Sequence, residues 1–280
     1  MNVFNTKAEL ALFIADAKSK KLSIGFVPTM GALHDGHMSL IRRSVSENPI
    51  TVCSIFVNPT QFNNKKDFER YPITIDEDLK KLEKEKCDAI FLPSVQEMYP
   101  EQDNTQYDLG GIDKPMEGIF RPGHFNGMAM IVLKLFAAVN ADIAYFGEKD
   151  FQQLAIIKYI SKKYNVPTKV VGCPTLRDAD GLAMSSRNIL LNTDQRKNAL
   201  AISQTLFGAK EKINKESITN VKEWAKKNIE QTSNLRLEYF EIVNSETLES
   251  IKDWKDAENI NACIAAYAEE VRLIDNIKLK

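Results

Sequence analysis

Short apolar runs alternate with segments of helical periodicity through the first two thirds of the chain. The apolar runs predict strands over residues 22–28, 50–57, 88–93, 142–147 and 168–172. The periodic segments predict helices over 37–47, 78–86, 126–139 and 150–163, and Thr74 with Glu77 indicates a capping box before the second helix. This alternation favours a parallel sheet covered by helices on both faces. Such sheets bind ligands at the carboxyl ends of their strands, so functional residues are expected in the loops that leave the strands.

The pattern changes after about residue 190. Two charged helical segments, 193–213 and 217–230, are followed by strand-like runs over 235–243, 261–269 and 271–279. Helices followed by consecutive strands predict a small α+β domain. We therefore expect an α/β protein with a Rossmann-like parallel-sheet domain over residues 1–183 and a smaller C-terminal α+β domain over residues 184–280.

Charge and cysteine usage exclude several classes of protein. The 280 residues carry 37 basic and 38 acidic side chains, and this balance offers no clustered positive charge for a nucleic-acid backbone. Residues 1–21 are amphipathic and contain acids, unlike a signal peptide, and no apolar stretch is long enough to span a bilayer. We expect a cytoplasmic protein with no membrane partner. The cysteines are far apart, which suggests neither a zinc site nor a disulfide framework, and Cys53 and Cys263 are expected to be buried.

The segment PTMGALHDGH directly follows the first predicted strand and opens the next helix. A helix N-terminus offers N–H groups and a partial positive charge, and an imidazole there can donate to phosphate oxygens. Gly31 and Gly36 allow a base or a phosphate to approach the backbone closely. His34 and His37 are three residues apart, so on a first helical turn they can face one ligand. The segment indicates anion binding, with an ordinary glycine turn capped by histidines as the alternative.

Two further segments combine amides and a lysine. FVNPTQF leaves a strand with the neutral amides Asn58 and Gln61, which suit a small polar ligand, although an ordinary Asn-Pro turn is the alternative. GEKDFQQ leaves another strand, and Lys149 and Gln153 are expected to share a helix face. The alternative there is a solvated helix start.

Two more segments carry arginine. RDADGLAMSSRN places the hydroxyls of Ser185 and Ser186 beside Arg187, which could hold phosphate in a bidentate manner, and a surface loop is the alternative. RPGHF places Arg121 and His124 before a buried helix, where they could also serve only as capping groups. No P-loop, dinucleotide fingerprint, zinc-protease motif or serine-nucleophile motif occurs. Such loops suit an enzyme that positions a nucleotide triphosphate while two substrates react with each other.

In order and spacing, GFVPTMGALHDGH, FVNPTQF, RPGHF, GEKDFQQ and GLAMSSRN resemble the motifs of the pantothenate synthetase (pantoate–β-alanine ligase) family. The resemblance covers about residues 22–191 and implies a nucleotidyltransferase fold related to class I aminoacyl-tRNA synthetases. It implies a ligase in which (R)-pantoate attacks the α-phosphate of ATP, giving pantoyl adenylate and pyrophosphate. β-Alanine then displaces AMP to form pantothenate, the vitamin B5 precursor of coenzyme A.

The resemblance also assigns roles to residues of this sequence. It implies that His37, as proton donor, acts in catalysis with His34, Lys149 and Arg187. The ATP-binding residues it implies are Met30, Gly31, Ala32, Leu33, His34, Asp35, Gly36, His37, Gly147, Glu148, Lys149, Asp150, Leu176, Met184, Ser185, Ser186 and Arg187. It implies that pantoate is bound by Gln61, Gln153 and Asn58, that β-alanine is bound by Gln61, and that Tyr71 supports that end of the site.

Further expectations follow from the same resemblance. Magnesium is expected to be held mainly by the phosphates, with no protein metal site. A homodimer is expected, and the C-terminal domain is expected to act as a lid that protects the adenylate. Ile73 and Leu190 depart from the family pattern, where arginine and tyrosine are expected, and put only local loop contacts in doubt.

Three other functions compete with this one. A nucleotidylyltransferase would use similar histidine loops, but a phosphate acceptor would call for more cationic side chains than FVNPTQF and GEKDFQQ provide. A tRNA synthetase is disfavoured by the missing basic surface and the short chain. A nucleotide-binding module without turnover would not need Gln61, Lys149 and Gln153.

Overall fold

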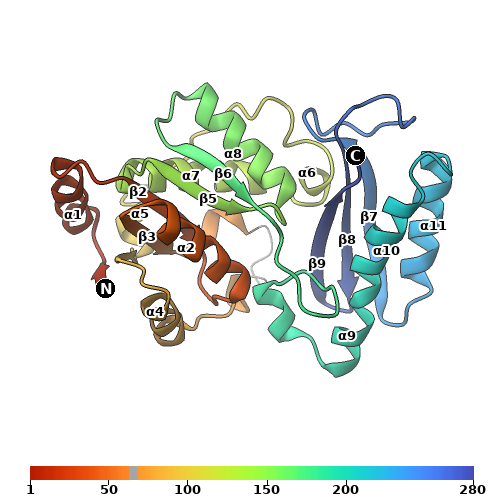
Figure 1. The fold of residues 1–280 in the computed structure, drawn as a ribbon, viewed down its shortest axis with the longest axis horizontal. Coiled ribbons are helices and arrows are strands. Elements are labelled where there is room, and N and C mark those ends of the chain that lie inside the picture. The colour runs from red at the N-terminus through yellow and green to blue at the C-terminus, as the bar shows by residue number, and fades with distance from the viewer. Residues whose placement is uncertain (63–67) are drawn as a thin grey trace. The chain divides into compact units, whose positions relative to one another are not determined.

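The computed structural model describes residues 1–62 and 68–280, and its contacts divide the chain into two compact units (Figure 1). Unit 1 contains Met1–Asp113, Phe120–Glu148 and Gln153–Pro174. Unit 2 contains Lys114–Ile119, Lys149–Gln152 and Thr175–Lys280.

Unit 1 is built on a six-stranded sheet in which every strand pair is parallel. Its strands, in spatial order, are β1 (Asn2–Phe4), β4 (Ala89–Phe91), β3 (Ile50–Ile55), β2 (Ile24–Thr29), β5 (Ile143–Gly147) and β6 (Lys169–Cys173). The five predicted strands are present, and the predicted parallel α/β sheet is confirmed. Strand β1 was not predicted because it is only three residues long and forms only by pairing with β4.

Helices cover both faces of this sheet. Alternating strand residues point to opposite faces, and accordingly Phe26 joins one apolar cluster and its neighbour Val27 another. The first cluster contains residues of α1 (Lys7–Ser19), α7 (His124–Val139) and α8 (Phe151–Lys163). The second contains residues of α2 (Asp35–Glu47) and α4 (Ile75–Lys84). The result is three layers with the sheet in the middle.

Helix α4 corrects one prediction. It begins at Ile75 rather than Asp78, and Thr74 is its N-cap, but the side chain of Thr74 makes no capping hydrogen bond. The predicted capping box is therefore wrong. The hydroxyl of Thr74 instead donates to Oδ1 of the buried Asp78 at 3.2 Å, because that carboxylate lies one turn along the helix.

Unit 2 has the predicted α+β composition. Its antiparallel sheet has the order β7 (Leu235–Asn244), β8 (Ile260–Ala268), β9 (Val271–Lys278), and residues of α10 (Leu200–Glu211) and α11 (Ile218–Glu230) share an apolar cluster with it. The single helix predicted over 193–213 is two helices, α9 (Thr193–Asn198) and α10, with the break at Ala199. The shorter elements of the chain are η1 (Pro59–Gln61), α5 (Val95–Met98), α6 (Glu117–Phe120) and η2 (Ser186–Leu190).

A buried charged cluster ties two short inserted segments to the sheet of unit 2. Arg272 of β9 donates to both carboxylate oxygens of Glu117 at 2.9 and 2.7 Å, and Tyr239 of β7 donates to Glu117 Oε1 at 2.8 Å. Gln152 accepts from the Glu117 N–H at 3.1 Å. These bonds explain why Lys114–Ile119 and Lys149–Gln152 belong to unit 2. The C-terminal part of unit 2 begins at Thr175, whereas the boundary expected from the sequence is at Met184.

Two expectations about composition can be compared with the structure. All four cysteines are buried, as expected for Cys53 and Cys263, and burial raises the pKa of both thiols. In the parts of the chain that the structure describes, no helix is both long enough and apolar enough to cross a membrane.

Candidate active site

The segment PTMGALHDGH, residues 28–37, is called the histidine loop here because it contains His34 and His37. It lies at the carboxyl end of β2, where the sequence predicted a functional loop. Strand β2 ends at Thr29, and α2 begins at Asp35 with His34 as its N-cap. Gly31 and Ala32 between them have positive φ angles of 83° and 49°. A Cβ on Gly31 would lie 3.1 Å from Ile55 and 3.2 Å from Asp78, so glycine suits this position for both space and conformation.

The two histidines of this loop cap the helix with their own rings. Their centroids lie 4.1 Å apart. The Gly36 N–H donates to His34 Nδ1 at 3.1 Å, and the His34 N–H donates to His37 Nδ1 at 3.3 Å. A nitrogen that accepts a hydrogen bond carries no proton, so this geometry assigns the ring proton of each neutral histidine to Nε2. The Nε2–H is therefore the donor group of each ring.

This geometry refines the expectation that the helix N-terminus itself binds the anion. The N–H of Gly36 is paired with the ring of His34, and the N–H of His37 donates to the His34 carbonyl at 2.8 Å. These two main-chain donors are engaged within the loop. The rings, rather than these two N–H groups, are the part of the loop suited to a phosphate.

The loop is also held from outside by α4. The carboxylate of Asp78 accepts the N–H of Ala32 at 2.8 Å and the N–H of Leu33 at 2.8 Å. Lys81 donates to the Leu33 carbonyl at 2.6 Å. Asp78 was not predicted to hold this loop, because an acid in the first turn of a helix has an ordinary explanation in the helix dipole.

The FVNPTQF loop lies at the carboxyl end of the neighbouring strand, β3. Asn58 is 1% exposed, and its amide donates to the Gly127 carbonyl at 3.1 Å and accepts from the Tyr99 hydroxyl at 2.9 Å. Burial raises the pKa of Tyr99, which keeps this phenol protonated as a donor. The His124 ring lies 2.7 Å from the main-chain oxygen of Gln61. The structure thus gives Asn58 and His124 roles in holding the turn, while direct contact between Asn58 and pantoate stays a prediction.

Gly127 explains how this loop approaches α7 so closely. A Cβ at Gly127 would lie 2.1 Å from the main-chain oxygen of Thr60, a distance that no side chain tolerates. The sequence did contain a signal for this contact, since an isolated glycine in an apolar helical run usually has a packing reason. Tyr71, expected at this end of the site, is buried and its ring lies 5.7 Å from that of Phe62.

The remaining predicted ATP-binding residues fall mainly in unit 2. Leu176 and Met184 face each other across a hairpin, with the Met184 N–H donating to the Leu176 carbonyl at 3.0 Å. Ser185 caps η2 by accepting the Arg187 N–H at 3.2 Å, and Ser186 is buried. One short stretch of unit 2 therefore contains the expected residues Leu176, Met184, Ser185, Ser186 and Arg187.

Two residues of β9, Asp275 and Asn276, bind the hairpin and the main chain of Lys149 through hydrogen bonds. Arg177, in the hairpin, donates to both carboxylate oxygens of Asp275 at 2.6 and 2.9 Å. Burial raises the pKa of Asp275, and the guanidinium of Arg177 acts in the opposite direction. The side chain of Asn276 donates to the Lys149 carbonyl at 2.8 Å. No local signal in the sequence pointed to Arg177, Asp275 and Asn276, because their partners are far away in the chain.

The GEKDFQQ segment requires one correction. Gly147 ends β5, and Glu148 remains in unit 1, where its N–H donates to the Cys173 carbonyl at 2.8 Å. Helix α8 begins only at Phe151, so Lys149 and Asp150 lie in the preceding turn. The expectation that Lys149 and Gln153 share a helix face is therefore wrong. The two residues also belong to different units.

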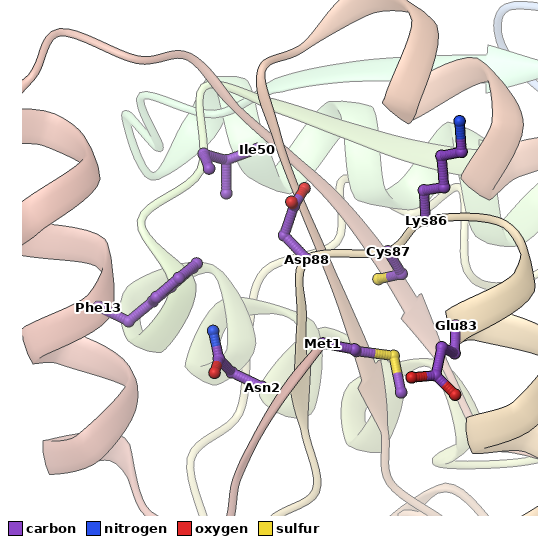
Figure 2. A pocket seen from close by; sticks show the side chains of 8 residues that line it. All are labelled: Met1, Asn2, Phe13, Ile50, Glu83, Lys86, Cys87 and Asp88. Atoms are coloured by element: carbon purple, nitrogen blue, oxygen red, sulfur yellow. The ribbon is translucent and has the colours of Figure 1, made fainter.

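The other features of the described residues do not add to this site. Residues 1–62 and 68–280 contain no group of three or more His, Cys, Asp or Glu side chains arranged to hold a metal ion. Ile73 and Leu190, the two departures from the family pattern, are exposed. A cavity of about 320 Å³ lies at the amino ends of β1, β3 and β4 in unit 1, away from the carboxyl ends that carry the predicted loops. Figure 2 shows the side chains that line it. It is lined by Met1, Asn2, Phe13, Ile50, Glu83, Lys86, Cys87 and Asp88 and contains none of the expected site residues.

Comparison with known proteins supports the family that the sequence motifs of these loops indicate. The family model of pantoate–β-alanine ligase matches residues 2–278. Pantothenate synthetase of Bacteroides thetaiotaomicron is 49% identical over 280 residues, which cover 100% of this chain and 99% of that protein. The crystal structure of pantothenate synthetase from Thermus thermophilus superposes with a TM-score of 0.93 at 38% identity, covering 100% of this chain and 99% of that one.

A further solved structure contains ligands. Pantoate–β-alanine ligase from Francisella tularensis, complexed with β-γ ATP and β-alanine, superposes with a TM-score of 0.79 at 33% identity and covers 100% of this chain and 98% of that one. The family that the five motifs predicted is therefore confirmed over the full length of the sequence. The chain is an enzyme of the pantoate–β-alanine ligase family.

Proposed function

We propose that the Nε2–H groups of His34 and His37 bind the phosphates of ATP while the carboxylate of pantoate attacks the α-phosphorus. The ligase condenses (R)-pantoate with β-alanine and ATP, giving pantothenate, AMP and pyrophosphate through a pantoyl adenylate. The observation that carries the proposal is the reciprocal cap at the start of α2, which turns the Nδ1 atoms of both rings to the main chain. Preorganised donors of this kind stabilise charge that develops in a transition state.

The other expected site residues complete the proposal. Lys149 and Arg187 neutralise charge on the phosphates, and residues 30–37, 147–150, 184–187 and Leu176 contact ATP. Gln61 and Gln153 bind pantoate, with Asn58 in support, and Gln61 also contacts β-alanine. The close packing of the Pro59–Gln61 turn on Gly127 supports a role for Gln61, because a rigid turn limits where its amide can lie.

Magnesium enters this proposal with the nucleotide. Phosphate oxygens of the nucleotide are the expected ligands of the ion, since Mg²⁺ usually binds through substrate phosphates and water. When bound, the ion would neutralise charge on the leaving pyrophosphate. We also propose that the enzyme is cytoplasmic and forms a homodimer, while the lid role of residues 184–280 stays a prediction.

Isotope transfer tests the chemical route. The sequence contains no serine-nucleophile motif, and we infer that the pantoate carboxylate itself attacks phosphorus. Pantoate labelled with heavy oxygen in its carboxylate should transfer one labelled oxygen to AMP, measured by mass spectrometry. Pyrophosphate should also form without β-alanine, up to about one equivalent per site, because a shielded adenylate is protected from water.

The unlabelled outcome has a clear meaning. If AMP carries no label although pantothenate forms in full yield, the adenylate route is wrong. Attack by an enzyme side chain or by the hydroxyl of pantoate would give that result.

A further inference from the structure

We propose that Asp78 is a positioning residue for the adenylation step, because its carboxylate sets the backbone that presents His34 and His37. The inference rests on the proposed role of the two histidines at the phosphates of ATP. It assigns to α4 a part in the reaction although Asp78 contacts neither substrate in this account. Asp78, His34 and His37 all belong to unit 1.

Two consecutive main-chain N–H groups before His34 converge on one carboxylate. Gly31 and Ala32 both have positive φ angles, and the next two N–H groups, of Ala32 and Leu33, point to the same carboxylate. Consecutive N–H groups converging in this way form a nest, which in other proteins binds phosphate or another anion. Here the anion is the side chain of Asp78, with one carboxylate oxygen 2.8 Å from each N–H.

The burial of Asp78 makes this contact strong and specific. The residue is 0% exposed, and a buried carboxylate is tolerated only when its oxygens are hydrogen-bonded. It receives the two N–H groups and the Thr74 hydroxyl. Ala32 has a Cβ and a positive φ, a strained conformation that needs such support from its surroundings.

Helix α4 holds the Leu33 residue from both sides. Asp78 accepts its N–H, and Lys81, one turn along the helix, donates to its carbonyl at 2.6 Å. The next residue is His34, whose main chain and ring both take part in the cap of α2. A displacement of Leu33 therefore moves both rings, and errors of about 1 Å in a catalytic group can cost roughly a hundredfold in rate.

The substitution Asp78→Asn tests this role with little change in shape. It replaces one acceptor oxygen by an NH₂ group, which cannot accept the N–H of Ala32 or Leu33. We expect kcat/KM for ATP to fall about tenfold to a hundredfold, the range for losing hydrogen bonds to a charged group. KM for β-alanine should change less than about twofold, since the loop acts before the amine enters. Asp76→Asn, an exposed acid in the same helical turn, is the matched control and should behave as wild type.

A double-mutant cycle separates positioning from general damage. If Asp78 acts through the histidine loop, Asp78→Asn should add less to the ATP defect of His34→Ala than it does to the wild type, because one of the two positioned rings is already gone and only that of His37 remains. Fully multiplied defects would overturn the proposal. So would an Asp78→Asn enzyme that loses thermal stability but keeps wild-type kinetics for ATP.

Two further outcomes are distinguishable. If Asp78→Asn does not fold, Thr74→Val replaces it: the variant keeps the carboxylate, loses one donor, and should raise KM for ATP about twofold to fivefold without affecting β-alanine. Unchanged ATP kinetics in the folded Thr74→Val enzyme would then overturn the proposal. If His34→Ala itself has wild-type ATP kinetics, the proposed role of the histidines fails, whatever Asp78→Asn does.

Discussion

The histidine loop of unit 1 and the hairpin region of unit 2 are both expected to bind ATP, but they are fastened differently. In the loop, the side chains expected at the phosphates are also the caps of α2, since both rings of His34 and His37 accept main-chain N–H groups. In unit 2, other residues do the fastening. The ion pair of Arg177 with Asp275 holds the hairpin, and Asn276 holds the main chain of Lys149.

This difference separates function from stability in one region and joins them in the other. Truncating Lys149 removes a charge and leaves the bond to its carbonyl intact. Truncating His34 removes an expected phosphate ligand and a helix cap together. Paired measurements of kinetics and unfolding should therefore give different patterns for the two regions.

The largest effect is expected from breaking the fastening of unit 2. Asp275→Leu leaves the Arg177 guanidinium, whose side chain is 19% exposed, without its carboxylate. Removing one partner of a buried ion pair typically costs about 3–5 kcal/mol of unfolding free energy. Urea unfolding followed by circular dichroism measures it. The exposed ion pair Lys226–Glu230 provides the control, since Glu230→Gln should change stability by less than about 1 kcal/mol.

Removing the Lys149 charge should slow the reaction without lowering stability, because the hydrogen bond from Asn276 to the Lys149 carbonyl is kept. Lys149→Ala should slow adenylation about a hundredfold or more, the usual effect of losing one preorganised stabiliser of developing charge. The melting temperature should stay that of the wild type. Single-turnover formation of pyrophosphate measures the rate, and a near-normal rate would remove Lys149 from the mechanism.

In the histidine loop, one substitution should separate the two roles. Glutamine is the ordinary residue at the third position of a capping box, so His37→Gln can still accept the His34 N–H and should fold with nearly wild-type stability. Turnover should fall roughly tenfold to a hundredfold, because a hydrogen bond to a charged phosphate is lost. Stopped-flow kinetics measures the turnover of this variant, and calorimetry measures its stability. A loss of folding without a kinetic defect would indicate a structural role alone.

Loss of the cap itself should have a modest effect on stability, smaller than that of Asp275→Leu. His34→Ala should lower the unfolding free energy by about 1 kcal/mol, as for other lost N-caps, and should weaken ATP binding as well. His34→Asn retains a side chain that caps well and should recover the stability but not the ATP affinity. Recovery of both properties by asparagine would contradict a phosphate-binding role for the imidazole.

Local patterns in the sequence were sufficient for most of the architecture and for the family. Apolar runs and helical periodicity act over a few residues, so β2, β3, β5 and α7 appear close to their predicted positions. The five motifs that carry the resemblance are short and continuous, which is why they could be recognised without a structure. The errors were also local. The predicted capping box at Thr74 does not form, because the Thr74 hydroxyl donates to Asp78 instead. Helix α8 begins at Phe151, two residues after Lys149.

Contacts between distant residues were decided only by the folded chain. Asp78 meets Leu33 across 45 positions, Arg177 meets Asp275 across 98, and Glu117 meets Arg272 across 155. None of these residues carries a local signal for its partner, because an acid in a first helical turn or an arginine in a hairpin is equally stable facing solvent. Burial makes such pairs specific, since a desolvated charge must find its partner. Short motifs predict which side chains supply the chemistry, whereas which side chains hold them in place depends on how the layers pack.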